Sequence, residues 1–130
     1  MEKWMGKYSE VTYSFMRIVM GCLFACHGAQ KLFGVLGGQQ LISDPKYATA
    51  GIIEFLGGLL IAAGFLTGYA AFLASGEMAA AYFTVHAHGS FWPIVNKGEP
   101  AVLYCFAFLY IMCKGSGILS IDVLAKKAHH

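Results

Sequence analysis

Charged side chains are scarce in this chain of 130 residues. Only 12% of the residues are Asp, Glu, Lys or Arg, whereas 58% are hydrophobic, and the mean hydropathy is +0.60. A soluble protein of this size covers its core with more polar surface than that, which argues against an ordinary soluble domain. The composition therefore predicts an integral membrane protein with little mass outside the lipid bilayer.

Several motifs of known chemistry are also missing from the sequence. The chain has no glycine-rich nucleotide-binding loop, no haem-attachment motif and no Cys-x-x-Cys pair of the thioredoxin type. Its formal net charge is only +2, and it has no basic stripe that would grip a phosphate backbone. We therefore expect no nucleic acid partner.

What the chain does contain is a series of four apolar blocks, each close to the roughly 20 residues that span a bilayer as a helix. The fold class that they predict is all-α, an antiparallel four-helix transmembrane bundle that forms a single domain over residues 1–130. Only Thr67 and Gly68 separate the second block from the third, so these two helices should be antiparallel neighbours. The predicted helices cover about residues 11–33, 47–66, 69–88 and 100–119.

An even number of spans places both termini on one side of the membrane. The lysines on that side are Lys3, Lys7, Lys126 and Lys127, against Lys31, Lys46 and Lys97 on the other. Because cytoplasmic flanks carry an excess of Lys and Arg, this slight bias favours cytoplasmic termini. We expect a location in the cytoplasmic membrane of a bacterium or an archaeon.

The first apolar block ends in a stretch, Phe24 to Gly34, that takes in polar residues at bilayer depth. Such side chains cost roughly 2.5 kcal/mol or more each unless they face the protein interior, pair or snorkel to the interface. At about 100° per residue, Gly28 and Lys31 share the face of Arg17, with His27 at its edge. Cys22 and Cys26 fall on the opposite, apolar face.

The second and third blocks each carry one carboxyl group, on Glu54 and Glu77, which must pair or stay protonated in such a setting. Helical projection places His88 on the face of Glu77 and His86 on the opposite side. The candidates for ligand binding or proton relay are His27, Lys31, Glu54, Glu77 and His88. Arg17 is the candidate for a structural ion pair with Glu54 or Glu77.

Alternatives stay open at these positions. His27 and Lys31 could hold an anionic or quinone-like head group, or Lys31 could snorkel while His27 bonds a carbonyl or a carboxylate between helices. Axial ligation of haem or chlorophyll is disfavoured because His27 and His88 lie near helix ends. A redox pair or a metal site at Cys22 and Cys26 is disfavoured because the polar residues of the same helix project to another face, and we predict no metal ligands.

The chain resembles the DoxX family of small four-helix membrane proteins along nearly its whole length. The matching pieces are Phe24 to Gly34 with His27, Gly28 and Lys31; Glu54-Phe-Leu-Gly57-Gly58; His88; Gly98-Glu99 through Tyr104; and Gly115-Ser-Gly117-Ile-Leu-Ser120-Ile-Asp122. Relatives in this family include a membrane subunit of a thiosulfate:quinone oxidoreductase and a protein associated with oxidative-stress enzymes. Many others have no assigned activity, and kinship of fold does not fix chemistry.

The resemblance and the inward charges together suggest a membrane subunit of a redox system that holds a quinone-like or other small ligand between its helices. If the protein takes part in catalysis, we expect it to do so as a component of a quinone-linked oxidoreductase. The alternative is a non-catalytic accessory subunit of a larger respiratory or photosynthetic complex. Other membrane protein subunits are expected partners in both cases, and a homo-oligomer, including a transporter or channel, is a third hypothesis.

Overall fold

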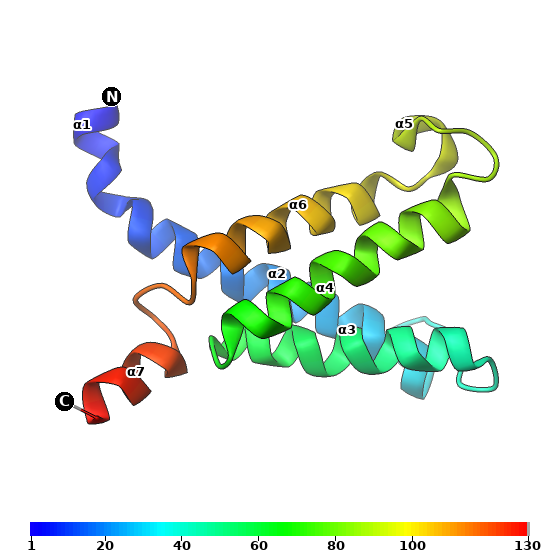
Figure 1. Cartoon of the computed structure of the whole chain (residues 1–130), viewed down its shortest axis with the longest axis horizontal. Coiled ribbons are helices and arrows are strands. Elements are labelled where there is room, and N and C mark those ends of the chain that lie inside the picture. The colour runs from blue at the N-terminus through cyan, green and yellow to red at the C-terminus, as the bar shows by residue number, and fades with distance from the viewer. Residues whose placement is uncertain (130) are drawn as a thin grey trace.

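A computed structural model describes residues 1–129 of the chain. The all-α class is confirmed, because no β-strand occurs within these residues. The long helices are α2 (Ser9–Phe33), α3 (Pro45–Ala63), α4 (Thr67–Ala81), which continues as a π-helical turn (Tyr82–His86), and α6 (Glu99–Lys114). The short elements are α1 (Glu2–Met5), a 3₁₀ turn (Gly6–Tyr8), α5 (Pro93–Asn96) and α7 (Ile121–Ala128) (Figure 1).

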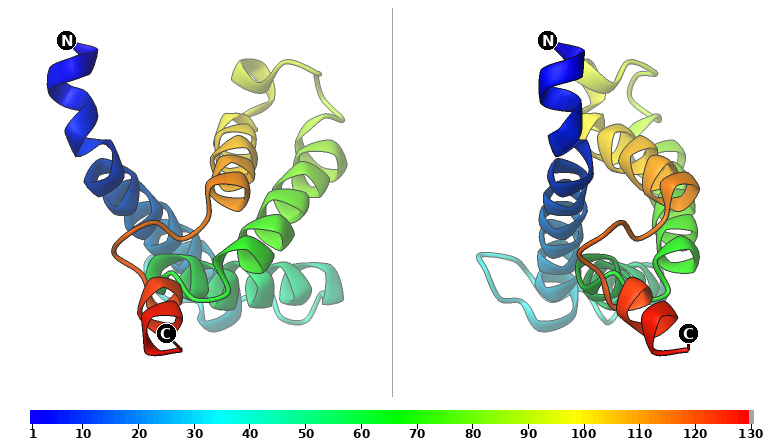
Figure 2. Two further views of the ribbon diagram at one scale, coloured as in Figure 1. Left: turned by 60° about the vertical axis from the view of Figure 1, so that its left-hand side comes forward. Right: turned by 90° about the vertical axis from the view of Figure 1, so that its left-hand side faces the viewer.

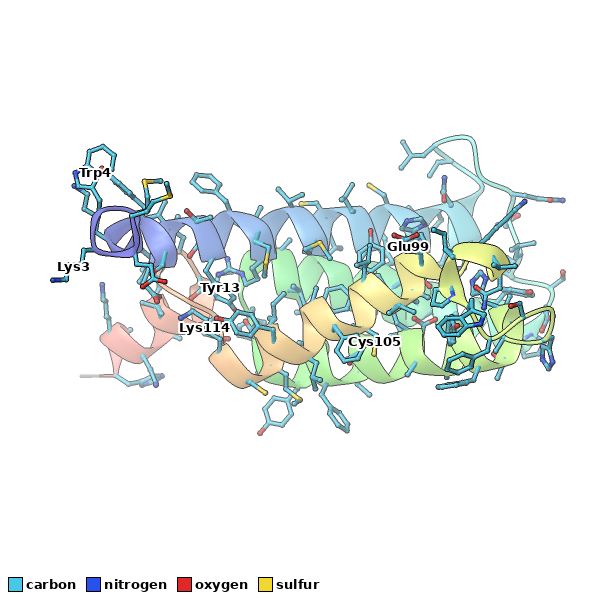
Figure 3. The ribbon with its side chains drawn as sticks, turned by 90° about the horizontal axis from the view of Figure 1, so that it is seen from above. Lys3, Trp4, Tyr13, Glu99, Cys105 and Lys114 are labelled. Atoms are coloured by element: carbon cyan, nitrogen blue, oxygen red, sulfur yellow. The ribbon has the colours of Figure 1, made fainter. Side chains whose placement is uncertain are left out.

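The long helices form two pairs of sequence neighbours. The pair α2 and α3 packs along its length, α4 packs against α6, and α3 also contacts α4 (Figure 2). The helices α1 and α7 lie at one end of the molecule, whereas α5 and the loop between α2 and α3 lie at the other. Labelled side chains mark this axis, with Lys3 and Trp4 at the first end and Glu99 toward the second (Figure 3).

Glycines allow the backbones of α2 and α3 to approach closely. A Cβ atom built on Gly21 would lie 2.5 Å from the backbone nitrogen of Ala62, and one on Gly28 would lie 2.7 Å from the carbonyl oxygen of Gly51. Real Cβ atoms do not tolerate such distances, so a side chain at either position would push the helices apart. Small residues at helix interfaces are typical of membrane proteins, where dispersion and hydrogen bonds drive helix association.

The core between the two pairs is aromatic. Phe24 of α2 lies with its ring centroid 4.7 Å from that of Phe108 and 5.5 Å from that of Tyr104, both on α6. Phe24 and Phe108 are almost fully buried. These rings connect α2 to α6 without close backbone contact, and they close one side of the space between the pairs.

The outer surface is strongly apolar. Large side chains such as Phe15, Leu23, Phe72 and Phe106 are each about half exposed or more. By length and composition, two helices are able to cross a membrane: the segment Glu2–Phe33, which contains α2, and α3. An exposed apolar surface of this extent is suited to lipid or to protein partners in the membrane.

Arg17 is fully buried near the end of the molecule that carries α1 and α7. Its Nε donates to the carbonyl of Ile61 at 3.0 Å, and its Nη atoms donate to the carbonyls of Ser116 and of Leu119, the latter at 2.5 Å. The expected ion pair of Arg17 with Glu54 or Glu77 is therefore wrong. Because α2 and α3 are antiparallel and in register at Gly21 and Ala62, Arg17 lies beside the C-terminal end of α3 and far along the axis from Glu54.

The end of the last long helix also differs from the sequence expectation. The last long helix ends at Lys114 and not near Leu119, because Gly115 adopts φ 91° and turns the chain away. Tyr13 donates its hydroxyl hydrogen to the Gly115 carbonyl at 2.5 Å. The segment from Gly115 to Leu119 is thus fixed against α2 and α3 by hydrogen bonds from Tyr13 and Arg17.

Asp122 closes the same end of the structure by capping α4. Its carboxylate accepts hydrogen bonds from the backbone N–H groups of Leu66 and Thr67 and from the Thr67 hydroxyl, at 2.9–3.1 Å. Burial alone would raise the pKa of the Asp122 carboxyl, but these hydrogen bonds, together with the Arg17 charge, hold its pKa below the usual range. The helix α4 has no cap from its own preceding residue, so α7 supplies the cap from a distant part of the chain.

We predict that Gly28→Ala lowers the free energy of unfolding by about 1–3 kcal/mol, because the new methyl group overpacks the α2–α3 contact. Gly76→Ala is the matched control, since a Cβ there meets nothing within 4 Å, and it should leave stability unchanged or raise it by up to about 1 kcal/mol. Unfolding of the purified protein by SDS titration measures both. Equal effects of the two substitutions would contradict the close packing.

Replacing the capping carboxylate should produce a pH-dependent loss of stability. We predict that Asp122→Asn costs about 1 kcal/mol at pH 7 through the weakened cap. The pKa of Asp122 is lower in the folded than in the unfolded state, so its stabilisation is complete above about pH 4 and is lost as the pH falls through the folded value. The difference in melting temperature between wild type and variant should therefore shrink at pH 3. An undiminished difference at pH 3, or an equal loss in the exposed control Glu2→Gln, would contradict the prediction.

Candidate functional site

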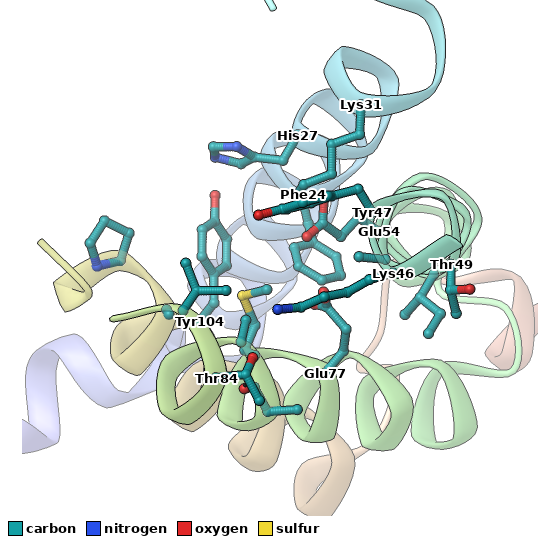
Figure 4. A pocket seen from close by; sticks show the side chains of 18 of the residues that line it. Phe24, His27, Lys31, Lys46, Tyr47, Thr49, Glu54, Glu77, Thr84 and Tyr104 are labelled. Carbon is teal, nitrogen blue, oxygen red and sulfur yellow. Dashed lines mark hydrogen bonds and ion pairs between the residues drawn. The ribbon is translucent and has the colours of Figure 1, made fainter. Parts of the chain in front are cut away.

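A cavity of about 370 Å³ lies between the two helix pairs, in the half of the molecule away from α1 and α7 (Figure 4). Its walls come from α2, α3, α4 with its π-helical turn, and α6. Most of the wall is apolar, and it includes Phe24, Ile53 and Met78. Polar side chains are concentrated at a few positions on this wall, and they determine what the cavity can bind.

An ion pair joins α2 to α3 at the cavity wall. The Nζ atom of Lys31 lies 2.5 Å from Oε2 of Glu54, and the exposed fractions of the two side chains are 24% and 2%. Gly51 lets Lys31 lie against α3, because a Cβ at Gly51 would be 3.2 Å from Cβ of Lys31. The pair gives Glu54 the partner that a carboxyl group in an apolar helix requires.

Glu77 faces the same cavity from α4. Its Oε2 atom is buried and has no hydrogen-bond partner within the described residues. A buried polar atom without a partner is uncommon in native proteins, because desolvation costs about 1–3 kcal/mol. This atom is therefore the position on the wall at which a further hydrogen-bonding group fits.

The two histidines of the third predicted span differ from the sequence expectation. His86 lines the cavity, whereas His88 is exposed and outside it. The projection assumed a continuous α-helix, but Tyr82–His86 is a π-helical turn in which the N–H of Ala87 bonds the Tyr82 carbonyl. The extra residue in that turn shifts the helical register by about 100°, and the helix ends at His86, so His88 lies beyond the helix and off the face of Glu77.

The remaining polar groups surround the cavity at different depths. His27 is exposed at its edge, with its ring centroid 5.9 Å from that of Tyr104 in an edge-on contact. Tyr104 is half-buried on α6, and Lys46 and Tyr47 reach the cavity from the start of α3. Sequence reasoning thus brought His27, Lys31, Glu54 and Glu77 to one place but missed Tyr104, Lys46 and His86.

No group of three or more His, Cys, Asp or Glu side chains in residues 1–129 is placed to hold a metal ion. Cys22 and Cys26 are exposed on the outer face of α2, as the projection predicted, and they are unpaired thiols in this part of the chain. The side chains on the cavity wall offer hydrogen bonds, charge and aromatic contact.

Comparison with known proteins places the chain in a family. The sequence profile of the DoxX family matches residues 12–87, which is more than half of the chain. The protein belongs to the DoxX family. An uncharacterized protein of Haemophilus influenzae is 40% identical over 123 residues, which cover 89% of this chain and 92% of that protein. No solved structure matches the sequence.

The family match covers the part of the cavity that α2, α3 and α4 form. Lys31, Glu54 and Glu77 lie within the matched residues, and so does Arg17. Tyr104 and the capping residue Asp122 lie beyond them, although the match to the Haemophilus influenzae protein extends over most of the chain. This DoxX protein is a membrane protein whose matched segment holds four charged groups of the cavity, Lys31, Lys46, Glu54 and Glu77.

We predict that Lys31→Met lowers the free energy of unfolding by about 3 kcal/mol, because it leaves the buried Glu54 carboxyl without its partner. The double variant Lys31→Met/Glu54→Gln should recover most of the loss. Lys114→Met is the matched control, because the pair of Lys114 with Glu10, at a distance of 2.8 Å, is exposed to solvent and its loss should affect stability much less. A double-mutant cycle in SDS unfolding measures the coupling, and additive effects of the two substitutions would contradict a buried pair.

Proposed function

We propose that this DoxX protein is an integral membrane subunit of a redox system and that its cavity holds the ring of a quinone-like ligand. In this proposal, α2, α3, α4 with its π-helical turn, and α6 cross the bilayer as an antiparallel bundle. The end with α1 and α7 carries Lys3, Lys7, Lys126 and Lys127, which supports placing that end, and both termini, in the cytoplasm.

The observation that carries the proposal is the presence of buried charged groups on the wall of a mostly apolar cavity. The Lys31–Glu54 pair and the unpartnered Oε2 of Glu77 all face it. Polar groups at membrane depth are costly, and they are typical of sites that bind a substrate, an ion or a proton. A ligand with an apolar body and a few hydrogen-bonding atoms packs against the apolar side chains of the wall and forms hydrogen bonds with its polar ones.

The size and lining of the cavity suit an aromatic or quinonoid ring. Small-molecule sites usually measure about 300–1,000 Å³ and combine apolar walls with a few polar groups, and this cavity of about 370 Å³ is within that range. Phe24, Tyr47 and Tyr104 offer aromatic surfaces against which a ring can stack. The carbonyl oxygens of a quinone can accept hydrogen bonds from Lys31 and from the histidines.

The opening of the cavity also favours a ligand from the bilayer. Its exposed wall residues include Thr49 of α3 and Ala80, Thr84 and Val85 of α4 and the turn. An opening between α3 and α4 faces the lipid if these helices cross the membrane, and a prenyl tail can extend through it. The ring then lies beside Glu77 and the Lys31–Glu54 pair.

A second function is favoured by a different observation. The outer face of α2 presents exposed Phe15, Val19 and Leu23, a surface that another membrane subunit can cover as well as lipid can. In that case the protein is a non-catalytic accessory subunit of a larger respiratory or photosynthetic complex. The Lys31–Glu54 pair then serves helix packing alone, and the cavity stays without a ligand.

A substitution that fills the cavity distinguishes a quinone-binding subunit from an accessory subunit whose cavity stays empty. We predict that Ala80→Phe weakens the binding of a short-chain benzoquinone by tenfold or more, because Ala80 lines the cavity and is exposed to it. Ala63→Phe, on the exposed side of α3 outside the cavity, is the control and should bind as wild type does. Isothermal titration calorimetry in detergent measures the affinities. Binding that resists Ala80→Phe, or wild-type protein that binds no quinone, would contradict the proposed site.

A further inference from the structure

Four charged side chains face the cavity, and one ion pair, Lys31 with Glu54, joins two of them. Two carboxyl groups, of Glu54 and Glu77, face it together with Lys31, and the Lys31 ammonium group is bonded to Glu54. The other titratable groups on the wall are His27 of α2, Lys46 and Tyr47 of α3, His86 of the turn and Tyr104 of α6. The structure forms no hydrogen bond between any of these and the buried Oε2 of Glu77.

Two partners are open to Glu77: the neighbouring Glu54 carboxyl, when a proton lies between the two carboxyl groups, and the bound molecule. A carboxylate only accepts hydrogen bonds, whereas a protonated carboxyl group also donates one. Glu54 already has a partner, because Nζ of Lys31 lies 2.5 Å from its Oε2, whereas Oε2 of Glu77 has no hydrogen-bond partner in the described residues. Glu77 is therefore the carboxyl group of the cavity whose protonation can follow the ligand.

We propose that Glu77 is the group that distinguishes the oxidised from the reduced form of the ligand, which rests on the proposed quinone site. Protonated Glu77 donates a hydrogen bond to a carbonyl oxygen of the quinone. Ionised Glu77 accepts a hydrogen bond from a hydroxyl group of the quinol. No electron moves in either binding step, and only the proton on the Glu77 carboxyl is taken up from or released to water.

The proton balance gives opposite pH dependences for the two forms. Where free Glu77 is ionised, quinone binding takes up one proton, so its affinity falls as the pH rises, by up to about tenfold per pH unit. Where free Glu77 is protonated, quinol binding releases one proton, so its affinity rises with pH by the same factor. A ligand that contacts no titrating group would show neither slope.

The test measures the affinity of wild-type protein in lipid nanodiscs for a short-chain benzoquinone and for its quinol between pH 5.5 and 9. We expect slopes of opposite sign for the two probes. Glu77→Gln should bind both with little pH dependence, because an amide donates and accepts at every pH. The matched control is Glu99→Gln, a carboxyl group that is exposed and outside the cavity, and it should keep both slopes.

The outcomes separate this inference from the proposed function. Slopes of equal sign or no slope in wild type, or slopes that persist in Glu77→Gln, would overturn the role of Glu77 while leaving the quinone site intact. Loss of the slopes in His27→Gln or His86→Gln, with retention in Glu77→Gln, would assign the switch to a histidine and contradict the inference. Wild-type protein that binds neither probe would overturn the proposed function and the inference together. If Glu77→Gln fails to fold, the pH dependence of the quinone and quinol affinities in the wild-type protein still tests the inference.

Discussion

The ion pair of Lys31 with Glu54 is the interaction on which the candidate site depends. A direct ion pair lowers the cost of placing a carboxylate and an ammonium group at membrane depth, and the 2.5 Å contact of this pair requires α2 and α3 to lie close together. Gly21 and Gly28 permit that approach, because any side chain there would meet the backbone of α3. Close packing at the glycines therefore allows the Lys31–Glu54 pair to form, and the pair holds α2 and α3 together where they line the cavity.

The polar residues at the other end of the molecule have a different role. Arg17 is as deeply buried as Glu54, yet it binds backbone carbonyls of α3 and of the segment after α6. Asp122 binds the backbone at the start of α4. These contacts leave no polar atom of either side chain facing the cavity, so this end holds the helix pairs together while the opposite half keeps an unsatisfied carboxyl group.

The period of the α-helix was enough to predict part of this arrangement. It placed Lys31 and Gly28 on the inner face and Cys26 outside, and it identified Glu54 and Glu77 as groups that need partners. It was wrong about His88, because a π-helical turn changes the register after Tyr82. It could not identify the partners of Arg17, since backbone carbonyls freed at helix ends leave no mark in the sequence. Tyr104 was missed because an aromatic residue in an apolar span usually indicates packing.

The central claim is that the cavity of this DoxX protein is occupied in its native membrane. Native mass spectrometry of the protein extracted gently from its own membranes tests that claim most directly. The account predicts a bound molecule at one copy per chain that is released by organic solvent and has the mass and absorption spectrum of a prenylated quinone. A chain of bare mass that carries no small molecule, or one found only within a larger assembly with its cavity empty, would contradict it.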